Sequence, residues 1–327
     1  AGAISTVIYP VVVHWVWGEG FLSAWGAYPD DEGNARPLLT GTAKSNGMLD
    51  FAGSGVVHMV GGFCGLIGAI LVGPRRFRFD AVTGIPAEAP PGDPMLLCLG
   101  TLILWFGWYA FNCGSTLALS GNAANVAGKA ALSTTISATT ACMLATSLAR
   151  IFDKYFNISV AVNGVLCGLV SITAACAFTD PWMAFIIGGI GAVIFFFSRS
   201  ALLKLGIDDP LDAFPVHGAC GLWGVVAAGI FCTDANVQYA GYPNVNNACS
   251  SGEQFGVQLI GASSILLWTT ITAGFCFWVL RKTIGIRVSA SVEEDGLDNF
   301  EHGGYIIAMK EKASQDGDQN ERGKEQY

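Results

Sequence analysis

Long apolar stretches separated by polar connections dominate the chain. Most are about 20 residues long, the length that an α-helix needs to cross a bilayer core of roughly 30 Å. They lack the period-two alternation of barrel strands, so we predict helices throughout. The predicted segments are a first, partial one at 2–17 and further ones at 50–73, 94–119, 126–149, 159–178, 182–203, 212–233 and 254–280.

Positive charge alternates between the connections. Lys and Arg gather in every second connection, as at Arg75 and Arg76 after the second segment and at Arg281 and Lys282 after the last, whereas 234–253 has neither. By the positive-inside rule, we expect the basic connections and the C-terminus to be cytoplasmic.

The composition supports a membrane protein and excludes several other classes. The chain is 52% hydrophobic and only 13% charged, whereas soluble domains average about 25% charged residues. The net charge of −8 gives no indication of a nucleic-acid partner. Most of the ten cysteines lie inside apolar runs, where cysteine behaves as a small hydrophobe. The sequence shows no metal-ligand spacing, nucleophile motif or phosphate loop, so we expect neither a cofactor nor an enzyme.

The first residues resemble a helix that is entered part-way. The opening "AGAISTVIYPVVVHWVWGEG" has no Met and no basic region before its apolar run, so it does not match a signal peptide. We expect an N-terminal part of about three helices to be missing, and we expect the chain without those helices to be inactive on its own.

Two apolar segments carry a histidine in related surroundings. Val57-His58 precedes "CGLIG" and Val216-His217 precedes "CGLWG", although the spacing differs by three residues. The two segments are five helices apart and therefore run in opposite directions. This arrangement suggests inverted five-helix repeats, with 94–233 as the complete second repeat.

Both histidines fall near the middle of the bilayer. His58 lies about 12 Å, and His217 about 8 Å, inside the start of its helix at roughly 1.5 Å per residue. Each could be a polar side chain satisfied by a backbone carbonyl, but ionisable groups inside membranes are usually functional. Two neutral imidazoles can share one hydrogen bond and still offer one donor and one acceptor to a pore or a proton relay. Axial haem ligation is the weaker alternative.

Several carboxylates and aromatic residues have both a structural and a functional interpretation. We expect Asp50, at the outer start of its helix, to cap free N–H groups rather than to bind a ligand directly, and Asp209 and Asp212 to cap at the inner side. The aromatic run "WFGWYAFNCGS" (105–115) and Trp17 fit either an interfacial belt or a cation–π site with a hydroxyl acceptor.

Four motifs together resemble the ammonium transporter family, which includes the methylammonium permeases and the Rhesus proteins. They are "DFAGSGVVHMVGG", "WFGWYAFNCGS", "DDPLDAFPVHGACGLWG" and "EEDGLDNFEHGGY", and they are most similar to the plant and algal type. The resemblance implies an all-α polytopic fold of eleven helices, of which about the last eight are present, in inverted five-helix repeats. It also implies a homotrimer with one pore per subunit.

The resemblance assigns roles to particular residues. Trp17 and Ser115 match an external cation site. Phe111 matches one of two gating phenylalanines, with Trp108 beside it, and Asp50 matches an aspartate beneath the site.

The same family pattern places His58 and His217 as a twin-histidine pair in the pore. The implied function is recruitment of ammonium at the aromatic site and passage of ammonia, with a separately relayed proton, past the two histidines. Methylammonium is a second expected substrate.

The resemblance also divides the chain. Residues 1–287 are expected to form the transmembrane domain, ending in the helix 254–280, and residues 288–327 to form a cytoplasmic regulatory tail. Within it, "GLDNFEH" resembles a segment that contacts the neighbouring subunit. The expected location is the plasma membrane, and an ammonium sensor is the alternative function.

Overall fold

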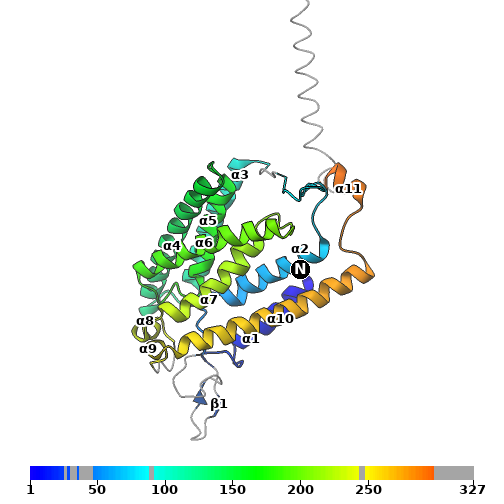
Figure 1. Cartoon of the computed structure of the whole chain (residues 1–327). Helices are drawn as coiled ribbons and strands as arrows, with labels where there is room; N and C mark the ends of the chain where they lie inside the picture. The colour runs from blue at the N-terminus through cyan, green and yellow to red at the C-terminus, as the bar shows by residue number, and fades with distance from the viewer. Residues whose placement is uncertain (26–27, 30–34, 37–46, 88–91, 243–246, 298–327) are drawn as a thin grey trace, which may run out of the picture.

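All eight predicted segments form helices in the computed structural model, which describes every residue except 26–27, 30–34, 37–46, 88–91, 243–246 and 298–327. Three of the helices begin with a π-helical segment, which we label η. Figure 1 shows the arrangement of the helices. In chain order the helices are η1 and α1 (Ile4–Ile8, Tyr9–Trp17), η2 and α2 (Ser54–Met59, Val60–Val72), α3 (Pro94–Gly114), α4 (Asn122–Phe152), α5 (Ile158–Thr173), α6 (Pro181–Lys204), η3 and α7 (Phe214–Ala219, Cys220–Phe231) and α10 (Glu253–Thr283).

Short elements lie at the two ends of these helices. They are α8 (Asp234–Tyr239), α9 (Ala248–Ser251) and α11 (Ala290–Asp295), together with an antiparallel pair of two-residue strands, β1 (Tyr28–Pro29) and β2 (Ala35–Arg36). The prediction of a helical fold is therefore confirmed. The tail after Leu297, including most of "GLDNFEH", lies outside the described residues.

The helix ends differ from the predicted ones for local reasons. Asp93 and Asn157 cap α3 and α5, because each side chain accepts hydrogen bonds from the first backbone N–H groups of its helix. Helix α3 ends at Gly114 instead of 119, and α5 ends at Thr173 instead of 178. Hydropathy misses both ends, since the apolar run continues into the following turn.

Six of the described helices are long and apolar enough to cross a membrane, judged by length and composition. They are Ser54–Val72, Pro94–Gly114, Asn122–Phe152, Pro181–Lys204, Phe214–Phe231 and Glu253–Thr283. Ile4–Trp17 and Ile158–Thr173 are apolar but shorter.

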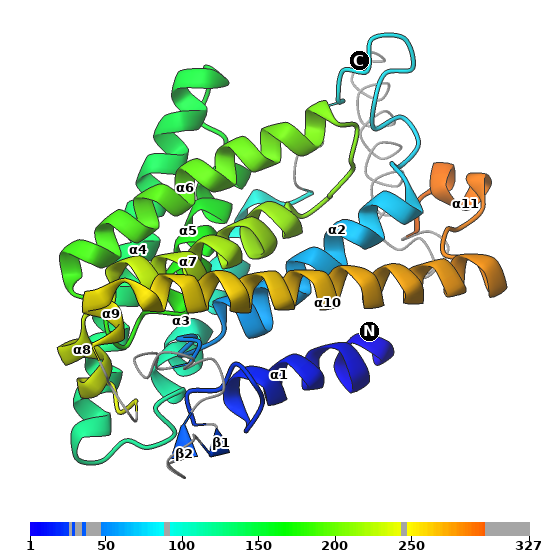
Figure 2. The same ribbon diagram turned by 60° about the horizontal axis from the view of Figure 1, so that its bottom comes forward.

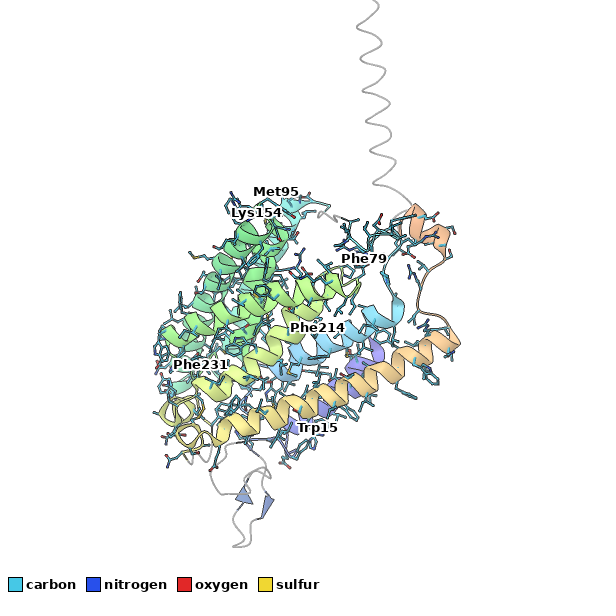
Figure 3. All side chains as sticks on the ribbon, in the orientation of Figure 1. Trp15, Phe79, Met95, Lys154, Phe214 and Phe231 are labelled. Carbon is cyan, nitrogen blue, oxygen red and sulfur yellow. A yellow bond between two sulfur atoms is a disulfide. The ribbon has the colours of Figure 1, made fainter. Side chains whose placement is uncertain are left out.

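The helices pack in one layered bundle. The long helix α10 runs beside α2 and α7, which point in opposite directions, while α4, α5 and α6 pack together on the other side (Figures 1 and 2). Helices α8 and α9 lie at one end, with β1 and β2, and α11 lies at the other. Figure 3 shows the same two ends of the bundle. Phe79, Met95 and Lys154 lie at the α11 end, and Trp15 and Phe231 lie toward the opposite end.

Small residues bring the central helices close together. The face of α4 that is buried carries Ala138, Ala141 and Ala145, each fully inaccessible. A Cβ placed on Gly168 of α5 would lie 2.5 Å from the carbonyl oxygen of Ser137. The high glycine content thus allows backbones to approach closely, as in other membrane helix bundles.

Ion pairs join three segments at the α11 end. The buried Asp208 carboxylate, between α6 and η3, pairs with Arg75 at 2.7 Å and Arg78 at 3.4 Å. In the same region Arg76 pairs with Glu294 of α11 at 3.0 Å, and Glu293 pairs with Arg287 of its own segment at 2.8 Å. These contacts tie the connection after α2 to the segment that leads into η3.

Candidate functional site

His58 and His217 meet inside the bundle. Their Nδ1 atoms are 3.2 Å apart, and their rings stack with centroids separated by 5.2 Å and planes 16° apart. A hydrogen bond at this distance requires one Nδ1 to carry the proton and the other to accept it. The pair therefore offers one Nε2–H donor and one bare Nε2 acceptor, and Nε2 of His58 is buried without a hydrogen-bond partner among the described residues.

The distance between the two histidines disfavours the haem alternative. An iron held by two axial imidazoles separates the ligating nitrogens by about 4 Å, since each metal–nitrogen bond is roughly 2 Å long. The two Nδ1 atoms are closer than that and face each other directly.

Both histidines project from π-helical segments. His58 lies in η2 and His217 in η3. Single π-turns inside helices shift side chains out of the regular α-helical spacing and often occur at functional sites. Apolar periodicity could not reveal these segments, since each is only six residues long and continues directly into a helix.

Glycines allow the two histidine-bearing helices to cross in contact. A Cβ on Gly62 would lie 2.0 Å from the backbone nitrogen of Gly218, and one on Gly221 would lie 2.6 Å from the carbonyl oxygen of Ser54. No side chain fits at either position without moving a backbone. The glycines of the two related motifs are therefore what bring the imidazoles within hydrogen-bond distance.

Two aromatic residues of α3 lie against His58. Trp108 stacks on its ring with centroids 5.0 Å apart and planes 11° apart, and Phe111 lies 5.7 Å from it. The indole Nε1 of Trp108 donates to the Thr173 hydroxyl at 3.0 Å, which fixes the ring. Trp108 and Phe111 thus form the wall next to the histidine pair.

Asp50 caps η2, as predicted. Its carboxylate is 1% exposed and accepts from the backbone N–H groups of Gly53 at 3.1 Å and of Gly55 and Val56 at 2.9 Å. The φ angle of +103° at Gly53 makes the turn that allows these bonds, and it favours glycine. The backbone carbonyl of Asp50 also accepts from Nε1 of Trp17 at 2.7 Å, which sets the position of that indole.

The two carboxylates before η3, Asp209 and Asp212, were both predicted to cap that helix, and only one of them does. Asp209 caps η3, because its carboxylate accepts from the backbone N–H of Phe214 at 2.8 Å. The prediction of a cap at Asp212 is wrong. Its carboxylate accepts instead from Arg199 Nε of α6 at 3.1 Å and from Asn163 Nδ2 of α5 at 3.0 Å. These two side chains take the place of the backbone N–H groups that a cap would contact.

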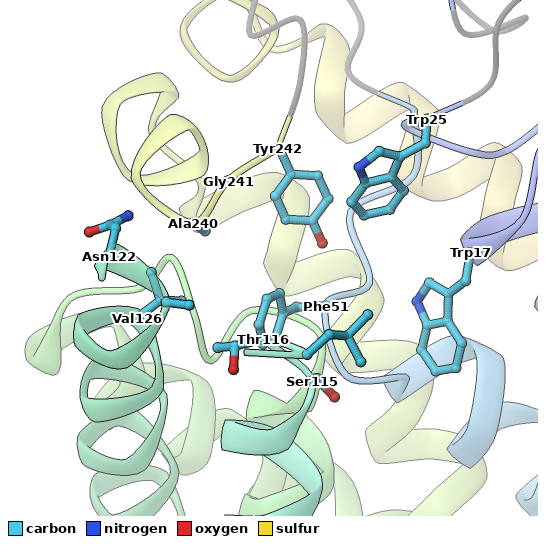
Figure 4. Close-up of a pocket in the computed structure, with 12 residues that line it drawn as sticks. Trp17, Trp25, Phe51, Ser115, Thr116, Asn122, Val126, Ala240, Gly241 and Tyr242 are labelled. Atoms are coloured by element: carbon cyan, nitrogen blue, oxygen red, sulfur yellow. The ribbon is translucent and has the colours of Figure 1, made fainter. Parts of the chain in front are cut away.

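A pocket of about 670 Å³ opens at the α8 end of the bundle, and we call it the vestibule (Figure 4). Trp17 and Ser115 both line it. The Ser115 hydroxyl donates to the Phe111 carbonyl at 2.9 Å, so its lone pairs remain available to accept from a ligand. An indole face beside a hydroxyl acceptor is suited to a small cation with N–H groups.

The remaining predicted residues do not line the vestibule. Asp50 lies behind it as a cap, and Trp108 and Phe111 contact His58. The seven predicted residues thus fall into three connected groups. Trp17 and Ser115 line the vestibule, and Asp50 is the cap that holds Trp17. The third group is the aromatic and imidazole cluster of Trp108, Phe111, His58 and His217.

Sequence reasoning missed three aromatic residues of the vestibule. Trp25, Phe51 and Tyr242 line it with Trp17. Trp25 and Tyr242 lie in polar connections, which hydropathy assigns to loops without indicating what they face. Phe51 directly follows Asp50, so its position next to a predicted site residue was the one available signal.

Sequence reasoning also missed Gln258 of α10, which holds the Asp50 segment in place. It donates to the carbonyl oxygens of Leu49 at 2.7 Å and Val225 at 2.9 Å, and it accepts from the Leu49 N–H at 2.7 Å. Its side chain is fully buried. A glutamine inside an apolar segment was the signal for this contact.

Comparison with known proteins identifies the family to which the chain belongs. A sequence profile of the Ammonium Transporter Family matches residues 2–305. Ammonium transporter Amt2 of Archaeoglobus fulgidus is 37% identical over 304 residues, covering 92% of this chain and 62% of that protein. Ammonium transporter 1 member 3 of Solanum lycopersicum is 36% identical over 329 residues, covering 95% of this chain and 68% of that protein. The chain therefore spans about two thirds of the length of these relatives.

Solved structures give the same result. A protein titled Sensor Amt Protein has a TM-score of 0.74 and 32% identity, with 90% of this chain and 66% of that chain covered. Candida albicans Mep2 has a TM-score of 0.73 and 26% identity, with 88% of this chain and 58% of that chain covered.

Proposed function

This chain belongs to the ammonium transporter family and is a multi-pass membrane protein, and we propose that it forms the conduction path of an ammonium transporter. The proposed substrate is ammonium, with methylammonium as an analogue. The observation that carries the proposal is the His58–His217 pair at 3.2 Å inside two apolar helices. A vestibule with an indole and a free hydroxyl acceptor lies on the approach to it.

Recruitment is the first proposed step. An ammonium ion in the vestibule would lie against the face of Trp17, with one N–H directed to Ser115. A cation–π contact is worth about 0.5–2 kcal/mol depending on desolvation. Asp50 would contribute a fixed negative charge and hold Trp17 through its carbonyl.

Separation of the proton is the second proposed step. A bare cation is costly in the bilayer interior, whereas neutral ammonia is much less so. Ammonia can donate to one Nε2 and accept from the other, which matches the one acceptor and one donor that the histidine pair presents. The proton would pass separately along the pair. Potassium carries no proton to give up, so this mechanism excludes it.

The assembly and orientation follow from the family and the charge pattern. We propose a homotrimer with one pore per subunit in the plasma membrane. Residues 1–287 would form the membrane domain, with 94–233 as one inverted repeat and 254–280 as the last helix. Residues 288–327 would be a cytoplasmic regulatory tail, since the basic connections lie at the α11 end.

Sensing is a second candidate function. The structural relative titled Sensor Amt Protein covers 90% of this chain. A sensor would bind ammonium in the same vestibule and pass the signal on through the tail. The test is to remove residues 298–327 and to measure both ammonium uptake and the response of the cells to ammonium. If both persist, the signal does not pass through the tail, and transport alone is favoured.

The proposed function is tested by flux measurements. We would reconstitute the protein that carries this sequence into liposomes and follow labelled methylammonium uptake. His217→Ala removes one partner of the pair and should lower flux roughly 10- to 100-fold, the effect of losing about 1.5–3 kcal/mol of a desolvated hydrogen bond. His14→Ala is the matched control, because His14 is an exposed histidine on α1. Equal flux in both variants would contradict the proposal.

A further inference from the structure

The vestibule contains a second aromatic corner next to the one formed by Trp17. Trp25 and Tyr242 lie together with ring centroids 5.1 Å apart and planes 30° apart, and both line the vestibule. Figure 4 shows the two rings side by side, with the Tyr242 hydroxyl directed into the pocket on the side of Phe51. These two residues come from connections that are more than 200 positions apart in the sequence.

Packing and hydrogen bonds hold Tyr242 firmly in this position. Its side chain is only 5% exposed and packs edge-on against Phe178 at 6.1 Å. Its backbone N–H donates to the carbonyl of Val237 at the end of α8. Tyr239, the last residue of α8, is held to α4 by Asn122, which donates to its carbonyl at 2.9 Å.

A disulfide closes the segment that contains Tyr242. Cys232, directly after α7, is bonded to Cys249 in α9. Asp234 adds hydrogen bonds to the backbone N–H of Cys249 at 3.1 Å and of Ser250 at 3.2 Å. The disulfide therefore closes the stretch of chain that contains Tyr242 into a covalent loop.

The polar atoms of this corner suit a cation with N–H groups. The Tyr242 hydroxyl has no hydrogen-bond partner among the described residues, although its ring is buried, so its lone pairs are free to accept. The nearby positive charge of Lys129 is engaged by Asp180 at 3.2 Å and lies over the ring of Tyr239. Its charge is therefore balanced by the Asp180 carboxylate.

We propose that Trp25 and Tyr242 form a second cation-binding site in the vestibule, for ammonium and small alkylammonium ions, separate from the site at Trp17 and Ser115. The cation would lie against the exposed face of Trp25, which is 47% accessible, and donate one N–H to the Tyr242 hydroxyl at its edge. The assignment of ammonium as the physiological ligand rests on the proposed function. The site would hold the ion before it moves to Trp17 and would raise its local concentration there.

Equilibrium binding tests this site without depending on transport. Methylammonium is the probe, and saturation-transfer NMR on its methyl protons reports binding to the purified protein that carries this sequence. Trp25→Ala removes one ring and should weaken apparent affinity roughly two- to fivefold, as expected for a partly exposed cation–π contact. Tyr242→Phe keeps the packed ring, removes only the acceptor, and should also weaken binding.

Two further variants make the test specific. Trp278→Ala is the matched control, because Trp278 is 53% exposed on α10 whereas Trp25 is 47% exposed in the vestibule. Trp17→Ala removes the first site and should leave a weaker saturable signal, which disappears when Trp25→Ala is added. The proposal is overturned if Trp25→Ala and Tyr242→Phe both bind as the wild type does, or if Trp17→Ala alone abolishes binding. Binding that depends on Trp25 without methylammonium flux would remove the transport function and leave this site standing.

Discussion

Asp50 acts on several backbone groups of one turn at once. Both carboxylate oxygens are used, since Oδ1 accepts from Gly53 and Oδ2 accepts from Gly55 and Val56. A buried acceptor of this kind organises the start of η2 and, through its carbonyl, the indole of Trp17. The predicted cap and the predicted cation site are therefore coupled through a single residue.

Replacing Asp50 by Asn should destabilise the protein by about 1–3 kcal/mol, because the amide –NH₂ would face at least one buried N–H donor. Thermal unfolding monitored by tryptophan fluorescence measures the effect. Asp93→Asn is the control, since Asp93 caps α3 at an exposed position and Asn caps equally well there. An Asp50→Asn variant that is as stable as Asp93→Asn would contradict this role.

Asp208 makes the stability depend on pH. Burial raises the pKa of its carboxyl, but hydrogen bonds and positive charge from Arg75, together with Arg78, lower it more, so the pKa lies below its ordinary value. A depressed pKa contributes stability above the unfolded-state value of about 3.9, and that stability is lost as pH falls through the folded-state value.

At pH 7, Asp208→Asn should therefore have a free energy of unfolding about 1–3 kcal/mol below that of the wild type and should unfold at a lower temperature. The difference should shrink at pH 3, where the wild-type carboxyl is becoming protonated. Thermal melts at both pH values provide the measurement, with Asp93→Asn as control, because Asp93 is exposed and Asn replaces it well as a helix cap. An equal difference at both pH values would show that charge is not the cause.

At the scale of single residues, the role of a side chain was easier to predict from the sequence than the residues that it contacts. The cap at Asp50 followed from its place before an apolar run, and the two histidines stood out because ionisable groups are rare in apolar segments. Tyr242 could not be predicted as a vestibule residue, since its position depends on how a loop folds back over α4 and α5. The two inner aspartates looked equivalent in sequence, and only the packing of Arg199 and Asn163 distinguished them.

At the scale of elements, the crossing of α2 with η3 determines the histidine pair. Gly62 lies where the two backbones touch, and a Cβ there would overlap Gly218. The sequence predicted both helices and their opposite directions. It could not predict the π-helical segments or this contact point, because both arise from the packing of two helices against each other.

Gly62→Ala should push the helices apart, cost about 1–3 kcal/mol of stability as overpacking does, and lower methylammonium flux by separating His58 from His217. Gly61→Ala is an adjacent control with no atom within 4 Å of the added Cβ. It should be neutral or slightly stabilising, since Ala favours helix more than Gly does. Thermal unfolding and flux would be measured for both variants. A Gly62→Ala variant with wild-type flux would contradict the claim that this helix crossing positions the histidine pair.

At the scale of the whole molecule, the hydropathy pattern predicted the eight long apolar helices and their order but not the short helices α8, α9 and α11, and the family motifs predicted the fold. Neither gave the three-dimensional link between the vestibule and the histidine pair. That link consists of Trp17 bonded to Asp50, and of Phe111, whose carbonyl accepts from Ser115 and whose ring lies against His58. It joins residues from α1, η2 and α3 and their connections, so it exists only in the folded chain.

Exclusion of potassium tests the central claim most directly, because the account makes selectivity depend on a proton leaving ammonium at the histidine pair. The measurement is the current carried by potassium and by ammonium through the reconstituted protein, for the wild type and for His58→Glu. We predict no potassium current in the wild type and a measurable one in His58→Glu, since a carboxylate in place of the imidazole would stabilise an intact cation at that point. Potassium exclusion that is unchanged in His58→Glu would contradict the account.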